Sequence, residues 1–184
     1  MPMSKIVLSL FIAIVCPMTI VATIAASQQP TLKFTVPSGW IEEERTSSMR
    51  VAQYRLPKAA GDTEDASLVL YYFGQSQGGS TAANMERWVS QIKQADGSSS
   101  KDKAKEEQLE ANGLKVATID ISGTYVAETA PGSGTFHNKP GYRLRAAVVE
   151  TAKGSYFVKL VGPEKTVAQW NDSFTSYLRS FEFK

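Results

Sequence analysis

The side chains that could carry metal or nucleophilic chemistry in this chain are few. Its 184 residues include one histidine, His137, and one cysteine, Cys16. Structural zinc sites and disulfide frameworks each need several such side chains, so both lack the residues they require. The sequence therefore predicts no metal site and no bound cofactor.

His137 lies in a segment, Ala130 to Gly141, that is too rich in glycine and proline for regular structure. A histidine in such a loop can serve as a general base or a single metal ligand, although most are simply solvated. A Ser-His-Asp site would have to use this histidine, and no Gly-x-Ser-x-Gly motif presents a nucleophile. Serine hydrolysis is therefore not expected.

Carboxylate pairs are the remaining route to catalysis, because they can meet in space without any revealing spacing in the sequence. The acidic runs Glu42 to Glu44 and Glu106 to Glu107 are more typical of solvated faces. We favour a protein that is not an enzyme. A small hydrolase or isomerase that uses a carboxylate pair in a cleft stays open as the alternative.

Five residues are candidate contacts with a partner. Trp40 follows a Pro-Ser-Gly turn and either covers a core edge or belongs to a contact surface. Arg143 and Arg145 share one face of an expected strand, where they form either a recognition patch or an exposed face with snorkelling arginines. Tyr142 and the loop that carries His137 lie next to them in the sequence, so the patch would include both.

The charge balance excludes other classes of partner. The chain has 20 basic and 18 acidic side chains, a formal net charge of +2, and no stripe of clustered lysine and arginine. Binding to nucleic acid or to an anionic membrane surface depends on such clusters. We expect no nucleic-acid partner, and contact with a membrane only through the N-terminal segment if that segment is not cleaved.

That N-terminal segment has the pattern of an export signal. Lys5 precedes an uncharged stretch from Ile6 to Ala26 that ends in small residues. This matches a basic region, an apolar core and a cleavage site near Ala25 or Ala26. The alternative is an uncleaved membrane anchor over residues 6–26. We expect residues 1–26 to direct export to the periplasm or outside the cell, and residues 27–184 to form one domain.

The patterning of that domain predicts a mainly antiparallel sheet. Asn112-Gly113 is a strong signal for a tight hairpin turn, and Thr151 to Gly154 joins a second hairpin. The run Leu68–Phe73 is apolar on both faces, so we expect it near the middle of the sheet. The expected strands are Leu32–Val36, Arg50–Leu56, the inner run Leu68–Phe73, Lys105–Ala111 paired with Leu114–Ser122, and Tyr142–Glu150 paired with Ser155–Val161.

Two amphipathic segments predict helices that cover the sheet. The first runs from Ala82 to Ala95 after a cap at Ser80 or Thr81, with an apolar stripe at Met85, Trp88, Val89 and Ile92. The second begins near Pro163 and Glu164, or alternatively one turn later at Thr166. Its buried side comprises Val167, Trp170, Phe174, Tyr177 or Leu178, and Phe181. The final Phe181 to Phe183 forms either a frayed turn or a short edge strand.

Together these elements predict an α+β fold in which helices flank a mostly antiparallel sheet. Four segments carry a resemblance to a known superfamily: Phe34 to Trp40, Tyr72 to Gly74, Asn84 to Trp88 and Tyr156 to Pro163. In these segments the chain resembles the PsbP-like and Mog1-like domains over roughly residues 30–184. The resemblance implies an α/β/α sandwich. It also implies a mostly non-enzymatic role, because these domains assemble with or regulate larger partners in photosynthetic membranes or nuclear transport.

The sequence thus favours an exported domain that works by binding or assembly with a protein partner of unknown identity. If the domain has a site, the long loop from Val126 to Gly141 is the place where we expect it, because long loops on a rigid sheet often carry function.

Overall fold

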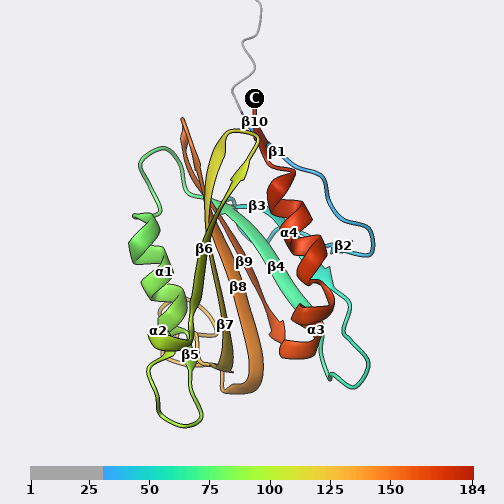
Figure 1. Cartoon of the computed structure of the whole chain (residues 1–184), viewed down its shortest axis with the longest axis vertical. Helices are drawn as coiled ribbons and strands as arrows, with labels where there is room; N and C mark the ends of the chain where they lie inside the picture. The colour runs from blue at the N-terminus through green and yellow to red at the C-terminus, as the bar shows by residue number, and fades with distance from the viewer. Residues whose placement is uncertain (1–30) are drawn as a thin grey trace, which may run out of the picture.

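The computed structural model describes residues 31–184, so the predicted export signal or anchor at residues 1–26 lies outside the described residues. Figure 1 shows the elements, of which the strands form the centre. In chain order they are β1 (Leu32–Lys33), β2 (Ile41–Glu42), β3 (Arg50–Leu56), β4 (Ala66–Tyr72), α1 (Thr81–Ser90), β5 (Ile92–Lys93), α2 (Ser100–Lys103), β6 (Lys105–Ala111), β7 (Leu114–Tyr125), β8 (Lys139–Thr151), β9 (Gly154–Pro163), α3 (Glu164–Gln169), α4 (Asn171–Arg179) and β10 (Glu182–Phe183).

The main sheet has eight strands in the order β2-β3-β4-β9-β8-β7-β5, with β6 also paired to β7. Every pairing in it is antiparallel. Both predicted hairpins are present, and Asn112 and Gly113 take the positive φ angles of 50° and 82° that their turn requires. The inner run is also confirmed, since β4 lies between β3 and β9 with Leu68 and Leu70 fully buried.

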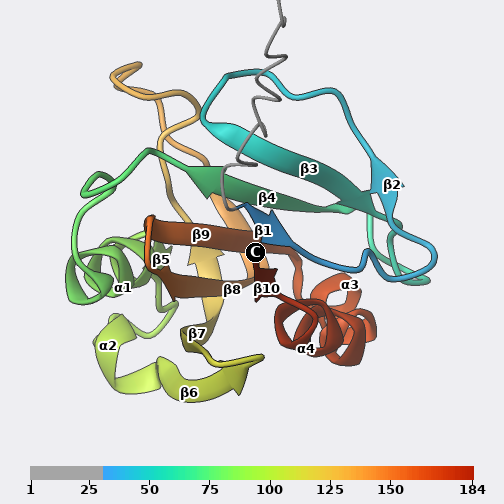
Figure 2. The same cartoon turned by 90° about the horizontal axis from the view of Figure 1, so that it is seen from above.

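Helices cover both faces of this sheet, as an α+β sandwich requires. Figure 2 shows α1 and α2 on one side and α3 and α4 on the other. Side chains along β9 alternate between the two faces of the sheet. Tyr156 and Val158 join the core under α3 and α4, whereas Phe157 joins the core under α1. The predicted fold class is therefore confirmed. We call the two sides the α1 face and the α4 face.

The first helix is shorter than its apolar stripe predicts. It ends at Ser90 rather than Ala95, and Ile92 belongs to β5, where it pairs with Tyr125 of β7. Met85 and Trp88 are buried as expected, but Ile92 reaches the same core from a strand. The prediction of the helix end was wrong because an apolar residue next to a helix can be buried by a sheet edge as well as by another turn.

The terminal helix is divided in two at Trp170. Helix α3 starts at Glu164, the earlier of the two predicted positions, and α4 starts again at Asn171. The indole ring of Trp170 reaches the loop after β3, where its Nε1 donates a hydrogen bond to the carbonyl oxygen of Pro57 over 2.9 Å. The buried stripe survives the break, since Val167, Phe174 and the residues that follow share one core.

Other boundaries also differ from the prediction. The connection from Asp96 to Lys105 contains the single helical turn α2. The first strand covers only Leu32 and Lys33, because its partner is the equally short β10. That pairing decides between the two predictions for the C-terminus in favour of an edge strand. Within residues 31–184, none of the helices has the length and apolar character needed to cross a bilayer.

Candidate functional site

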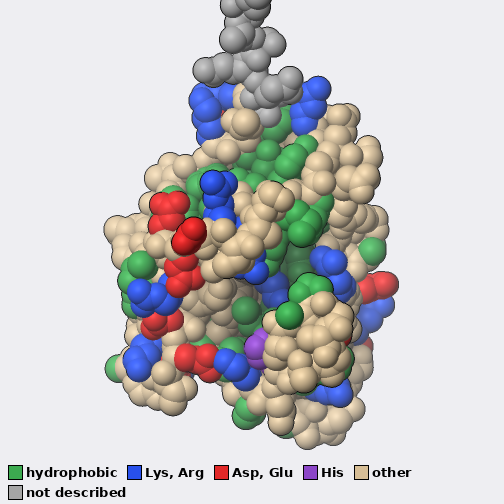
Figure 3. All heavy atoms as spheres, turned by 180° about the vertical axis from the view of Figure 1, so that it is seen from behind, with side chains coloured by type: hydrophobic (Ala, Val, Ile, Leu, Met, Phe, Trp, Pro, Cys, Tyr) green, Lys and Arg blue, Asp and Glu red, His purple; other side chains and the backbone are tan. Residues whose placement is uncertain are grey.

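A hollow on the α1 face is the most distinctive surface feature of the described residues. It has a volume of about 900 Å³ and is lined by β3, β4, β9, α1 and the loop between β7 and β8. Figure 3 looks onto this side and shows a hollowed stripe of hydrophobic side chains, with basic side chains deep inside it and the single histidine at its edge. We call this hollow the aromatic groove.

The groove exists because α1 is too short to cover its face of the sheet. The ten residues of α1 pack on β5, β7 and β8. The same face of β4 and β9 extends beyond the helix, so Val69, Tyr71 and Val161 line the floor of the hollow. Ligand sites in proteins are typically concave and mostly apolar in this way, with a few polar groups placed among the apolar ones.

Stacked rings form one wall. His137 lies 5.2 Å from Tyr125 between ring centroids, and Tyr142 lies 6.1 Å from Tyr125 on a nearly parallel plane. The backbone of His137 donates a hydrogen bond to the carbonyl oxygen of Ala127 over 2.9 Å, which holds the end of the loop against its beginning. The long loop that the sequence singled out therefore contributes a fixed wall.

A lysine lies in the floor. Lys159 of β9 donates hydrogen bonds from Nζ to Oε1 of Gln91 over 2.6 Å and to the hydroxyl of Tyr125 over 2.9 Å. Burial, with a smaller contribution from the positive charge of Arg87, lowers its pKa from 10.5 to about 8. An ammonium has three donors. Two of them have partners among the described residues.

Each acidic side chain of the groove already has a partner within the protein. Glu64 forms a salt bridge with Lys139 at 2.5 Å, and Asp65 forms one with Arg55 at 2.7 Å. Glu128 accepts hydrogen bonds from backbone amides of its own loop.

Three of the basic side chains are not neutralised. Among residues 31–184, no carboxylate lies within salt-bridge distance of Lys159, Arg87 or Arg50. Arg87 donates to the amide of Asn84, and Arg50 donates to Oε1 of Gln53. The groove thus combines apolar rings with uncompensated positive charge.

The arrangement does not favour acid–base chemistry by a carboxylate pair. A bond from Lys139 lowers the pKa of Glu64, and a bond from Arg55 lowers the pKa of Asp65. Both carboxyl groups are therefore held in the ionised form. A general acid–base pair needs one member kept protonated.

The predicted contact residues divide between the two faces. Tyr142 and His137 both line the aromatic groove. Arg143 and Arg145 lie on the α4 face, so the single patch proposed from the sequence does not form. The arginines are also not exposed snorkelling side chains, because both bond to Asp120, at 2.5 Å and 3.2 Å. Their neighbours in space belong to α4, and the guanidinium of Arg145 lies 4.6 Å from the ring of Phe174.

Trp40 proves to be a core residue on the same side as the arginines. It is 8% exposed, and its ring packs 5.0 Å from Tyr177 and 5.6 Å from Tyr54 between centroids. Of its two predicted roles, covering the core is the one that this geometry provides. A partner could not reach its ring without local opening.

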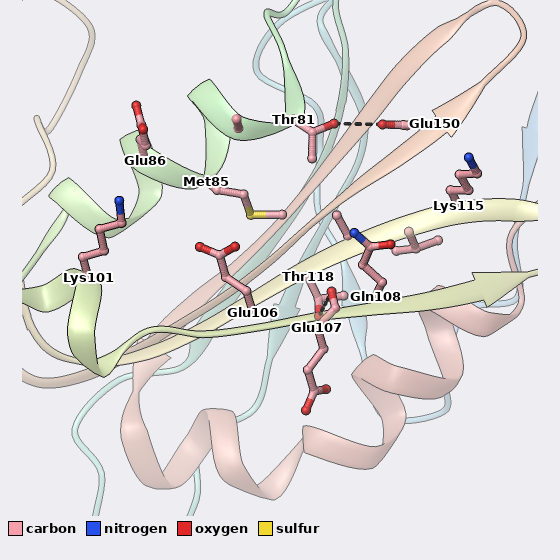
Figure 4. Close-up of a pocket in the computed structure, with 13 residues that line it drawn as sticks. Thr81, Met85, Glu86, Lys101, Glu106, Glu107, Gln108, Lys115, Thr118 and Glu150 are labelled. Atoms are coloured by element: carbon pink, nitrogen blue, oxygen red, sulfur yellow. Dashed lines mark hydrogen bonds between the residues drawn. The ribbon is translucent and has the colours of Figure 1, made fainter.

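A second hollow lies between α1 and the edge strand β6, with a volume of about 740 Å³ (Figure 4). The figure shows Glu106 pointing toward α1 and Glu107 pointing away, as neighbours on a strand must. Glu107 instead binds Lys105 at 2.6 Å. These two acids therefore do not converge on one site. The hollow is lined largely by the polar ends of side chains, and it has no apolar floor comparable to that of the groove.

Sequence reasoning missed Lys159, which the structure places at the centre of the groove. A signal was present, because this lysine interrupts the run from Tyr156 to Val161 that is otherwise apolar on both faces. Gln91 and Arg87 carry no such signal. Among residues 31–184, no three histidine, cysteine, aspartate or glutamate side chains gather as a metal ion would need.

No protein-family model matches this sequence, and no curated protein matches it. Solved structures do resemble it. LpqN of Mycobacterium tuberculosis, described as involved in cell envelope biogenesis, has a TM-score of 0.51 at 10% identity over 88% of this chain and 87% of its own.

Two further solved structures are similar at lower scores. Cyanobacterial PsbP (CyanoP) from Synechocystis sp. PCC 6803 has a TM-score of 0.48 at 13% identity over 85% of this chain and 92% of its own. PA94 of Pseudomonas aeruginosa, a putative regulator of unknown function, has a TM-score of 0.42 at 13% identity over 85% of each chain. At these identities the likeness concerns the fold alone. The expected sandwich of helices on a mostly antiparallel sheet is confirmed by the topology of the chain itself, and LpqN shares that fold.

Proposed function

We propose that this chain is an exported, non-enzymatic binding domain, and that its aromatic groove takes an apolar, acidic segment of a partner protein. One observation carries the proposal: the groove joins an uncovered apolar floor to basic side chains that have no acidic partner among the described residues. A surface of this kind is completed by an occupant that supplies both apolar contacts and negative charge.

The surroundings of the groove favour a protein segment over a small ligand. Met49 on one rim is 49% exposed, and Phe136 in the loop that forms the other wall is 63% exposed. Large exposed apolar side chains on both sides of a groove extend the contact area beyond the volume that one small molecule fills. Both would be covered by a chain that crosses the groove from rim to rim.

Export is the second part of the proposal. It rests on the apolar stretch from Ile6 to Ala26, which follows Lys5. The description of LpqN as a protein of cell envelope biogenesis agrees with a location outside the cytoplasm. Sequencing the N-terminus of the protein recovered from the native host tests it: a start near Ser27 supports cleavage, and a start at Met1 in the membrane fraction supports the anchor.

Binding is tested by selecting random peptides on the immobilised full chain and measuring their affinities by fluorescence anisotropy. Met49→Ser should weaken the selected peptides about tenfold, because it removes an apolar rim contact. Ile41→Ser is the matched control, since Ile41 is also exposed but lines neither hollow.

Two results would overturn the proposal. One is a failure to select any peptide that Met49→Ser weakens. The other is an equal loss of affinity in the Ile41→Ser control, which would mean that the peptides recognise apolar surface in general. Turnover of a substrate in a broad screen, lost when Glu64 is replaced by Gln, would favour the carboxylate enzyme instead.

A further inference from the structure

The ammonium of Lys159 has a donor to spare at the bottom of an otherwise apolar floor. Its two partners, Gln91 and Tyr125, are both neutral. Phe157 and Val161 flank it on the same face of β9 and line the same groove. A cation in such a place is costly unless a negative charge joins it.

Arg87 brings a second positive charge to the same groove. It projects from α1, and its charge adds to the lowering of the Lys159 pKa. Like charges that approach each other with no acid between them destabilise a fold. Lys159 and Arg87 are therefore better explained as an anion-binding site than as a contact that stabilises the fold.

We propose that Lys159 and Arg87 together form a subsite for the side-chain carboxylate of an aspartate or glutamate in the partner segment. This inference rests on the proposed function, because the segment must lie in the aromatic groove for its side chain to reach the floor. The groove is bounded by walls on two sides, the loop with His137 and the rim with Met49, so a crossing chain can direct one side chain down between apolar neighbours.

The expected motif follows from the surroundings of the subsite. The acidic residue should be flanked by aromatic or branched apolar residues, because Tyr71, Phe157 and Val161 line the same groove as Lys159. A carboxylate bound between two cations also makes charge-assisted hydrogen bonds, which are stronger than those between neutral groups.

The test uses one selected peptide that contains an acidic residue, its Glu→Gln or Asp→Asn counterpart, and the full chain. Lys159→Met should weaken the acidic peptide about tenfold or more and leave the amide peptide nearly unchanged, so a double-mutant cycle should show coupling. Arg87→Met should show the same pattern more weakly. Because Arg87 is exposed on α1, that variant tests the subsite even if Lys159→Met perturbs the fold.

Lys33→Met is the matched control, since Lys33 is an exposed lysine that lines neither hollow. It should leave both affinities unchanged. A peptide with an amidated C-terminus should bind as well as the free acid, because the proposal concerns a side chain. A loss of affinity on amidation would assign the subsite to a chain terminus and overturn the proposal as stated.

The acidity of the subsite offers an independent measurement. The affinity of the acidic peptide should fall as the pH rises from 7 to 9, because Lys159 loses its proton near pH 8, and the Lys159→Met variant should show no such fall. Equal losses for acidic and amide peptides would refute the subsite while leaving the groove as the binding site. If no selected peptide depends on Met49, the proposed function and this inference fail together.

Discussion

Lys159 and Gln91 join the central strand β9 to the end of helix α1 through a hydrogen bond of 2.6 Å between Nζ and Oε1. Gln91 is the C-cap of α1, and its own carbonyl oxygen accepts a bond from the amide of Val126, where the long loop begins. One residue therefore places the helix end, the start of the loop and the ammonium in the floor of the groove.

Gln91→Leu should lower the pKa of Lys159 below its value of about 8. The substitution removes a polar partner of the ammonium and leaves only the hydroxyl of Tyr125, so burial disfavours the charged form more strongly. A ¹³C NMR titration of the lysine ε-carbons would measure this change. Gln75→Leu is the control, because Gln75 is exposed and lies outside the groove. A pKa that stays the same or rises would show that Gln91 does not stabilise the ammonium.

Lys159→Met should stabilise the protein at pH 7, with a smaller gain at pH 10. The folded-state pKa of about 8 lies below the ordinary 10.5 of a free lysine. Below pH 8 both states hold the proton, and folding bears the full cost of the buried charge. Between pH 8 and 10.5 the unfolded chain holds more protons, so the wild type gains stability as the pH rises.

The difference between the two pH values should be on the order of 2 kcal/mol, measured by urea unfolding of wild type and variant at each pH. Lys33→Met should show no such dependence. A gain that is larger at pH 10 than at pH 7 would contradict the assigned direction of the pKa shift. A substitution that stabilises the fold and weakens binding of the acidic peptide is the pattern expected where a group is retained for function.

Asp120→Asn should destabilise the protein by about 3 kcal/mol, measured by urea unfolding. Asp120 accepts two hydrogen bonds from Arg143, at 2.7 Å and 2.5 Å, and lies 3.2 Å from Arg145. Arg145 has a side chain only 13% exposed, so the loss of its acidic neighbour leaves a largely buried charge without compensation. Glu107→Gln breaks the exposed pair with Lys105 and should cost far less, because water screens that pair. A similar loss of unfolding free energy in the two variants would show that Asp120 and its arginines stabilise the fold no more than an exposed ion pair does.

How far the sequence predicts this molecule depends on whether a property is local. The turn at Asn112 and Gly113 and the alternation along β9 are set by neighbouring residues, so the hairpins and the two-faced sheet could be predicted. The end of α1 and the break at Trp170 depend on contacts with Tyr125 and Pro57, which are distant in the sequence. Such contacts leave no local pattern.

The candidate site shows the same limit. The loop with His137 and Tyr142 could be singled out, because glycine, proline and length mark it. The charge balance of the groove could not, since it depends on which acids find partners: Glu64 meets Lys139, a residue 75 positions away. The sequence analysis groups Arg143 and Arg145 with Tyr142 because they are neighbours in the chain. Alternation along β8 places the two arginines on one face of the sheet and Tyr142 on the other.

Thr166→Val should destabilise the protein by about 1–2 kcal/mol and loosen the loop that follows β3. Thr166 is fully buried at the start of α3; its amide and hydroxyl both donate to Asp62, over 2.8 Å and 2.6 Å. The hydroxyl oxygen also accepts a bond from the amide of Ala59 over 3.1 Å. Valine keeps the shape of the side chain, so the change isolates the lost hydrogen bonds.

The loop held by Thr166 leads directly to Glu64 and Asp65, which line the aromatic groove. Hydrogen exchange of the amides from Lys58 to Asp65 should therefore accelerate in Thr166→Val, while amides of β8 keep their protection. Thr166→Ser keeps the hydroxyl and should lie between valine and wild type in stability, with little change in exchange at the loop. If serine accelerates exchange and valine does not, the methyl contacts rather than the hydrogen bonds hold this rim of the groove in place.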